Sequence, residues 1–167
     1  MKTLRNIIIA MLATMLALTT SCIEDGFTTS SSDLLEFSCD TLSFDTIFTE
    51  QGTPTKQFVV YNRHKKQINI SSISLSAADS RRFYLNVDGM KGEVFHDVAI
   101  RGEDSIFVFV ESKLNPNGQD APLLAEDCIN FTTNGVTQKV VLRAWGQDVE
   151  RLTRPQFTAD TRLTANK

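Results

Sequence analysis

Apolar and polar residues alternate in short runs along the chain from Leu34 onward. In the run "FYLNV" (83–87), every second residue is apolar, which is the pattern of a strand that buries one face. Comparable runs occupy 41–48, 56–62, 68–75, 83–87, 94–100, 105–111, 128–133 and 136–146. Helical spacing of apolar residues is hard to find after Leu18. The pattern predicts an all-β, antiparallel β-sandwich of about seven to nine strands.

The residues between these runs predict how the strands are joined. Asn134-Gly135 is the strongest short signal for a two-residue hairpin. The charged stretches "RHKK" (63–66) and "RGED" (101–104) also predict hairpin tips. In the first long run the apolar phase shifts between Phe44 and Ile47, as in a bulged strand. The run "IFVFV" (106–110) is apolar throughout and predicts a central strand.

The first 21 residues have the three-part layout of an export signal. Lys2 and Arg5 precede an apolar segment, "IIIAMLATMLAL" (7–18), and small polar residues follow it. The segment is short for a membrane-spanning helix, which needs about 20 apolar residues. Removing residues 1–21 also removes two cations, so the exported chain is more acidic than the full sequence, whose net charge is −3. That acidity argues against a nucleic-acid partner.

Cys22 follows the signal directly, in the stretch "LTTSC" (18–22). This stretch resembles the lipobox of bacterial lipoproteins, although Thr19 stands where leucine is usual. The resemblance implies that Cys22 carries lipid chains such as palmitate, which anchor the protein in a membrane. The alternative is an incidental cysteine after an ordinary cleavage site. The acidic "IEDG" (23–26) resembles the surface-export signal of Bacteroidetes-type lipoproteins, and the residues up to Asp33 read as a flexible tether, 22–33.

The sequence offers little chemistry for catalysis. His64 and His96 have no cysteine or carboxylate at a metal-ligand spacing. We therefore expect His64 to be a turn residue and His96 to be a residue at the edge of the sandwich. No phosphate-binding loop or nucleophile motif occurs, and we expect no enzyme activity, metal or cofactor. "ESKLNPNGQD" (111–120) holds oxygen ligands but reads as a turn rather than a calcium loop. Tyr61 and Tyr84 read as packing residues, and Trp145 as core or rim.

Two sets of residues are candidates for covalent modification. Cys39 and Cys128 remain once Cys22 is assigned to lipid, and they form either a disulfide or two unconnected thiols. Three triplets, "DTL", "DTI" and "DSI", resemble the O-glycosylation sequon of exported Bacteroidetes proteins, with Thr41, Thr46 and Ser105 as the acceptors. Each triplet also suits an aspartate that ends a turn before a strand.

Several stretches together resemble one family. They are "DTLSFDTIFT", "FVVYNRHKKQINISSISL", "FYLNVDG", "DSIFVFVE", "INFTTNG" and "LRAWGQD". They are similar to the N-terminal immunoglobulin-like domains of Bacteroidetes-type surface lipoproteins, related in style to ASPM/Hydin-like and choice-of-anchor sandwiches. The resemblance implies an immunoglobulin-like sandwich over 34–149 and brings no catalytic residues. In such proteins a right-handed parallel β-helix often follows, so 150–167 reads as a tail or a linker to a further domain.

Two functions are compatible with these observations. The first is an outer-membrane, surface-exposed lipoprotein whose sandwich serves as a non-catalytic binding, adhesion or spacer module, with a glycan or protein ligand. The second is an accessory or truncated N-terminal domain of a β-helix protein that processes surface polysaccharide. The second function calls for an acid pair or an exposed aromatic platform, and the sequence contains one tryptophan and two tyrosines. The sequence therefore favours the first.

Overall fold

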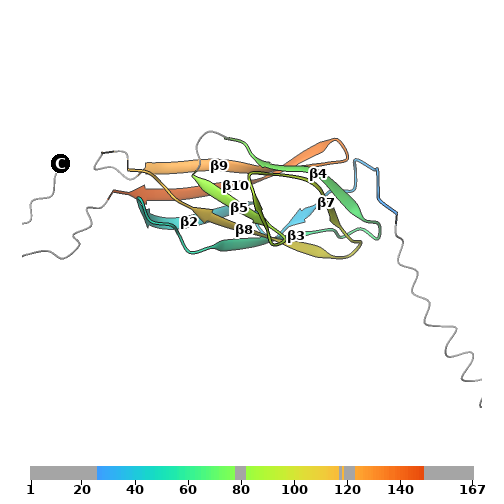
Figure 1. Ribbon diagram of the computed structural model, residues 1–167. Helices are drawn as coiled ribbons and strands as arrows, with labels where there is room; N and C mark the ends of the chain where they lie inside the picture. The colour runs from blue at the N-terminus through green and yellow to red at the C-terminus, as the bar shows by residue number, and fades with distance from the viewer. Residues whose placement is uncertain (1–25, 78–81, 117, 119–122, 149–167) are drawn as a thin grey trace, which may run out of the picture.

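Two five-stranded sheets pack face to face in the computed structural model (Figure 1). The structure describes residues 26–77, 82–116, 118 and 123–148. The strands among them are β1 (Glu36–Phe37), β2 (Thr41–Phe48), β3 (Lys56–Tyr61), β4 (Ile68–Leu75), β5 (Phe83–Val87), β6 (Met90–Gly92), β7 (Val94–Ile100), β8 (Ser105–Ser112), β9 (Leu123–Thr133) and β10 (Val136–Gln147). Sheet I has the order β1-β3-β8-β5-β6, and sheet II has the order β2-β10-β9-β4-β7.

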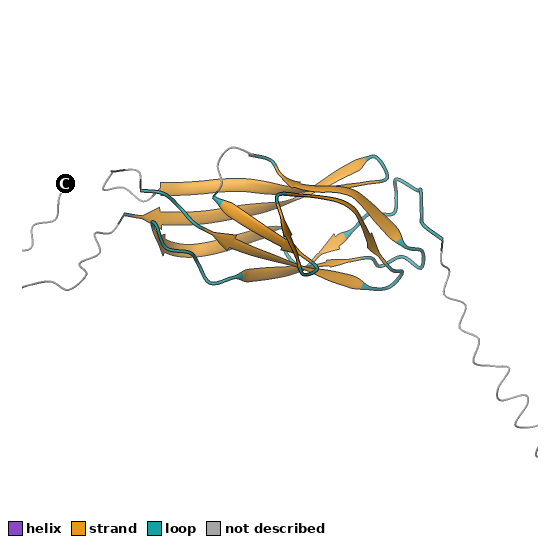
Figure 2. Cartoon of the chain, viewed as in Figure 1, coloured by secondary structure: helices purple, strands orange, loops and turns teal. Residues whose placement is uncertain are grey.

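The predicted all-β sandwich is confirmed. Strands and connecting loops make up the whole of the described chain (Figure 2). All eight predicted runs form strands, and the structure adds the short edge strands β1 and β6. The run 106–110 lies in β8, between β3 and β5, so the prediction of a central strand is also confirmed. One pairing departs from the antiparallel expectation, because β2 runs parallel to β10.

The phase shift in the first long run is a bulge in β2. Phe44 pairs with Ala144, and the next pair joins Thr46 to Trp145, so Asp45 has no partner in the register. A bulge of this kind inserts one extra residue and turns the following side chains over. The predicted irregularity in this strand is therefore confirmed.

The core lies between the inward faces of the two sheets. Phe131 of β9 contacts the aromatic rings of Phe37 and Phe58 in sheet I, with ring centroids 5.0 and 6.2 Å apart. Tilted and edge-to-face ring pairs are favourable beyond the apolar area that they bury. The largest fully buried side chains are Phe44, Phe58, Phe131, Ile68, Ile70, Ile73, Ile100, Leu114, Ile129, Leu142, Val60 and Val87. Burial of this apolar surface is what holds the two sheets together.

The charged loops 63–66 and 101–104 are not hairpin tips, and the prediction was wrong for both. Each loop leaves a strand of one sheet and enters a strand of the other, β3 to β4 and β7 to β8. The Asn134-Gly135 hairpin, by contrast, is confirmed between β9 and β10. Its two central residues have φ values of 49° and 79°, which is the left-handed pair that a type I′ turn requires.

The two crossings lie side by side at one end of the sandwich and are held by Asn62. This side chain is fully buried, and its amide nitrogen donates to the carbonyl oxygens of Lys66 (2.8 Å) and Arg101 (2.9 Å). Its amide oxygen accepts from the backbone N–H of His64 at 2.9 Å. The Glu103 N–H also donates to the His64 carbonyl oxygen at 2.9 Å. A buried polar side chain with these partners fixes one loop against the other.

The folded unit reaches back to Gly26, into the segment that composition assigns to a tether. The Thr28 N–H donates to the Gln67 carbonyl oxygen at 2.8 Å, and the Gln67 N–H donates to Gly26 at 3.2 Å. The Asn134 side chain donates to the Ser30 carbonyl oxygen at 2.9 Å. The described chain thus enters at one end of the sandwich, beside the crossings, and leaves from β10 at the opposite end (Figure 1).

Candidate ligand-binding site

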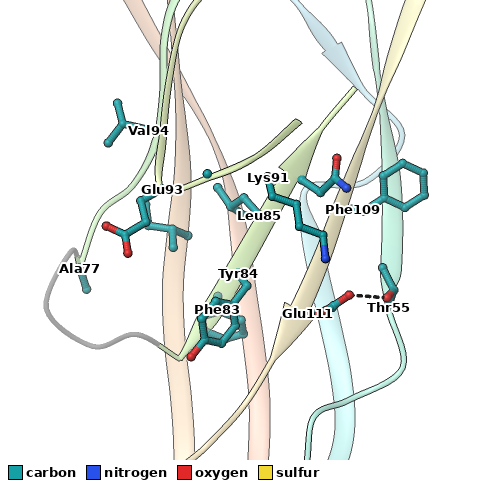
Figure 3. A pocket seen from close by; sticks show the side chains of 13 residues that line it. Thr55, Ala77, Phe83, Tyr84, Leu85, Lys91, Glu93, Val94, Phe109 and Glu111 are labelled. Carbon is teal, nitrogen blue, oxygen red and sulfur yellow. Dashed lines mark hydrogen bonds between the residues drawn. The ribbon is translucent and has the colours of Figure 1, made fainter. Parts of the chain in front are cut away.

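A pocket of about 610 Å³ lies beside the β5–β6 hairpin (Figure 3). Its lining comes from β5, β6, the start of β7, the end of β4 and two outward positions of β8. Thr55, Leu75, Ala77, Phe83, Tyr84, Leu85, Asn86, Lys91, Gly92, Glu93, Val94, Phe109 and Glu111 line it. Pockets of this size, with apolar walls and a few polar groups, are typical of small-ligand sites in proteins.

The pocket exists because β6 covers only part of β5. In the register, β6 pairs with β5 from Leu85 to Val87, whereas Phe83 and Tyr84 lie beyond its end. After Gly92 the chain crosses to sheet II and begins β7 at Val94. The edge of β5 is therefore open at this point, and the pocket extends around that edge.

The alternation of β5 divides the lining into two walls. The inward side chains Phe83 and Leu85 are buried, and the outward Tyr84 is 48% exposed. In the view of Figure 3, Lys91, Phe109, Thr55 and Glu111 lie to one side of β5, and Ala77, Glu93 and Val94 lie to the other. The first group, together with Tyr84 and Asn86, is named the outer wall.

The outer wall is set by strand pairing. Tyr84 lies opposite Glu111, and Asn86 lies opposite both Phe109 and Lys91. Residues directly opposite one another in antiparallel strands have Cβ atoms about 5 Å apart, so these side chains form one contiguous surface. The position of Glu111 is fixed further, because the Thr55 hydroxyl donates to its Oε1 at 2.9 Å.

Asn86 contributes an unsatisfied hydrogen-bond acceptor to this wall. Its Oδ1 atom is buried and has no hydrogen-bond partner within the described structure. A buried acceptor without a donor costs about 1–3 kcal/mol, so such atoms are uncommon in folded proteins.

The pocket lining combines aromatic and polar groups. Among its thirteen residues there is neither histidine nor cysteine, and its hydroxyls belong to Thr55 and Tyr84. Within the described part of the chain, no three histidine, cysteine, aspartate or glutamate side chains gather as metal ligands. The lining offers aromatic faces, an amide, a lysine and the two carboxylates of Glu93 and Glu111.

Cys22 lies outside the described residues, whereas Cys39 and Cys128 are both free thiols in the structure. The disulfide considered from the sequence is not formed, and the alternative of two unconnected thiols describes the structure. Cys128 lies opposite Val141 of β10, and β10 separates it from β2, which Cys39 precedes. The distance across two strand spacings is about 9.6 Å, which is more than a disulfide can span.

The two histidines lie away from the pocket. The Nε2 atom of His64 lies 3.1 Å from the Leu34 carbonyl oxygen, and its Nδ1 atom lies 3.7 Å from the Asp33 carboxylate. This carboxylate is a partner that the sequence spacing did not suggest. His96 is exposed on the edge strand β7, with Nδ1 3.3 Å from the Ser71 carbonyl oxygen. Both contacts are made to parts of the sandwich, and neither forms a metal site with the other described residues.

The three candidate glycosylation acceptors lie on two strands. Thr41 begins β2, Thr46 is exposed on the same strand, and Ser105 begins β8. The Asp104 carboxylate accepts a hydrogen bond from the Ser105 N–H at 2.7 Å, as in an aspartate that precedes a strand. Glycosylation of these residues stays a prediction.

The aromatic residues of sheet I were interpreted incorrectly from the sequence. Tyr84 was expected to pack, yet it is half exposed on the outer wall. Tyr61 is partly exposed on the same sheet and packs under the Arg63 guanidinium, 4.0 Å from the ring centroid. Phe107 and Phe109 also face outward, with stacked rings 6.2 Å apart. Trp145 was expected in the core, with the rim as the alternative, and the core expectation was wrong because the side chain is 41% exposed on β10.

Comparison with known proteins gives the fold class. No protein-family model matches the chain, and no curated protein matches it either. Similar solved structures include the ASH/PapD-like domain 7 of human CEP192, which is 11% identical with a TM-score of 0.44 and covers 81% of this chain and 99% of that one. The Escherichia coli chaperone DraB is 10% identical, with a TM-score of 0.42, covering 69% and 55%.

A Porphyromonas gingivalis protein of unknown function is also similar, 13% identical with a TM-score of 0.47, covering 75% of this chain and 51% of that one. Similarity at these identities concerns the architecture alone. The described part of the chain is a β-sandwich of two five-stranded sheets. None of the described residues forms a helix long and apolar enough to cross a membrane.

Proposed function

We propose that the chain is a lipid-anchored lipoprotein of the cell envelope whose sandwich acts as a non-catalytic binding module. The observation that carries the proposal is the pocket at the β5–β6 hairpin, with the exposed ring of Tyr84 in its lining. An apolar and aromatic lining with a few polar groups is the composition of a ligand-recognition site.

The sequence before the sandwich supports display outside the cytoplasm. Export through residues 1–21 and acylation of Cys22 would leave the sandwich attached to a membrane through a few residues. The first described residue, Gly26, lies four positions after Cys22, so the anchor would be close to the end of the sandwich that carries the crossings.

Binding at the pocket is tested by a ligand-observed and protein-observed fragment screen on the full chain in mild detergent. The probes are monosaccharides, amino acids, dipeptides and nucleotides, and the readout is the amide chemical shift of each residue. Shifts gathered at Leu85, Asn86 and Lys91 support the proposal. Shifts confined to other parts of the sandwich, or none with any probe class, contradict it.

The anchor is tested separately by fractionation of the bacterial host. Wild-type protein is expected in the membrane fraction, and Cys22→Ala in the soluble exported fraction, because the variant has no thiol to acylate. Cys39→Ala is the matched control, since it removes a cysteine that lies within the sandwich. Membrane retention of Cys22→Ala would contradict lipid anchoring.

A further inference from the structure

We infer that the pocket binds a neutral saccharide through the outer wall, where Tyr84, Asn86 and Phe109 meet. The inference deepens the proposed function and rests on it, because it names the class of ligand that the binding module takes. It draws on the ring faces, the hydrogen-bonding groups and the charge of this wall.

The aromatic faces suit the C–H surface of a sugar ring. Tyr84 is 48% exposed, and Phe109 lies in the adjacent strand on the same side of the sheet. The ring of Phe109 stacks on that of Phe107 at 28°, which holds it in one orientation. A ring face carries partial negative charge and attracts the weakly positive C–H groups of a pyranose.

The polar groups of the wall suit hydroxyls. A sugar hydroxyl donates one hydrogen bond and accepts others, so it needs donors and acceptors close together. The wall supplies both: the exposed Tyr84 carries a hydroxyl that donates and accepts, and Lys91 donates from β6. Glu111 accepts as well, and its bond from Thr55 uses one of its two oxygens.

The charge of the outer wall points to a neutral ligand. Lys91 and Glu111 balance one another on this wall, and Glu93 adds a negative charge across the opening of the pocket. A phosphate or sulfate group would meet no excess of positive charge here. An apolar peptide or lipid chain would cover Lys91 without offering it a hydrogen-bond acceptor, which costs affinity. A neutral polyhydroxylated ligand meets neither objection.

The inference is tested by affinity electrophoresis in gels that contain a single polysaccharide, followed by titration calorimetry with the fragments that bind. The probes are a neutral β-glucan, a neutral α-mannan, xylan and the anionic chondroitin sulfate. The full chain is compared with Tyr84→Ala and Lys91→Ala. Tyr61→Ala is the matched control, because Tyr61 lies on the same sheet and outside the pocket lining.

Retardation by a neutral polysaccharide is expected for the wild type and for Tyr61→Ala. Lys91→Ala is expected to bind about 10-fold more weakly, because it removes one hydrogen-bond donor. Its thermal unfolding midpoint should not fall, because Lys91 is exposed on β6. Tyr84→Ala is expected to weaken binding by about 10-fold or more through loss of its ring.

Three outcomes would overturn the inference. The first is no retardation by any of the neutral polysaccharides, and the second is salt-sensitive retardation by chondroitin sulfate alone. The third is a loss of binding in Tyr61→Ala equal to that in Tyr84→Ala. The proposed function would still stand after the first outcome if dipeptides or nucleotides shift the amides of the pocket in the fragment screen, so the two failures are distinguishable.

Discussion

The amide nitrogen of Asn62 lies 3.1 Å from the backbone carbonyl oxygen of Ile100, and this contact joins the end of β3 to the end of β7. The two strands belong to different sheets. Because Asn62 is fully buried, removing its side chain leaves carbonyl groups of both crossings without a donor and without water.

Asn62→Ala is therefore expected to lower the free energy of unfolding by about 3 kcal/mol. Urea denaturation followed by tryptophan fluorescence measures the change. Asn69→Ala is the control, because Asn69 makes an exposed side-chain hydrogen bond to Asp97, and it should cost under about 1 kcal/mol. Equal losses in the two variants would contradict the role assigned to Asn62.

Gly102→Ala is expected to destabilise the same end of the sandwich through steric overlap. A Cβ atom at this position would lie 1.9 Å from the carbonyl oxygen of Lys65, a backbone atom that cannot turn away. The expected loss is about 3 kcal/mol or more. Gly52→Ala is the control, since a Cβ atom there meets nothing within 4 Å. An unchanged thermal unfolding midpoint in Gly102→Ala would contradict the prediction, because it would show that the two crossings can move apart easily.

Cys39 is expected to react slowly with iodoacetamide near neutral pH. Burial, together with the neighbouring Asp40 carboxylate, raises the pKa of this thiol above its ordinary value near 9. The alkylation rate in the folded protein should therefore rise at higher pH than in the urea-unfolded chain. Mass spectrometry of the Cys39 peptide measures both rates. If the alkylation rate of the folded protein has its midpoint at a lower pH than that of the unfolded chain, the upward shift of the pKa is contradicted.

The raised pKa of Cys39 also sets the direction of a stability change with pH. The folded state favours the neutral thiol, so this contribution is present below the ordinary pKa and is lost as the pH rises through the raised value. Wild type should lose more stability than Cys39→Ala between pH 8 and the raised pKa. The comparison uses thermal unfolding of both proteins in matched buffers.

Asp127→Ala is expected to loosen the end of β4 beside the pocket. The Asp127 carboxylate accepts hydrogen bonds from the N–H groups of Ser76 (3.1 Å) and Ala77 (3.0 Å), and Ala77 lines the pocket. The expected cost is about 2 kcal/mol, with faster amide exchange at residues 76 and 77. Glu126→Ala is the control, because Glu126 pairs with Arg143 at an exposed position and should cost under about 1 kcal/mol.

The strands could be predicted from the sequence because each carries its own alternation. β2, β4, β5 and β7 begin and end where their apolar runs do. The crossings could not be distinguished from hairpins by the same means. "RHKK" and "RGED" would be polar in a hairpin and in a crossing alike. A hairpin and a crossing differ in whether the following strand pairs within the same sheet, and that pairing depends on distant residues. Asn62, polar at the end of an apolar run, was the one local sign of a buried contact.

The pocket was missed for a related reason. Asn86 occupies an outward position of β5, where a polar residue is ordinary, and nothing near it in the sequence shows that its oxygen will be buried without a donor. Phe107 and Phe109 lie in a run that is apolar at every position, so their outward direction could not be read from alternation. The open edge of β5 depends on where β6 leaves the sheet, at Gly92.

The parallel pairing of β2 with β10 has a mechanical consequence. The described chain enters at one end of the sandwich and leaves at the other, so tension between a membrane anchor and anything attached beyond β10 would pull these two strands in opposite directions along their length (Figure 1). All seven register pairs between them would then carry the load together rather than open one after another. The pairing of β2 with β10 therefore resists stretching between the two ends of the sandwich.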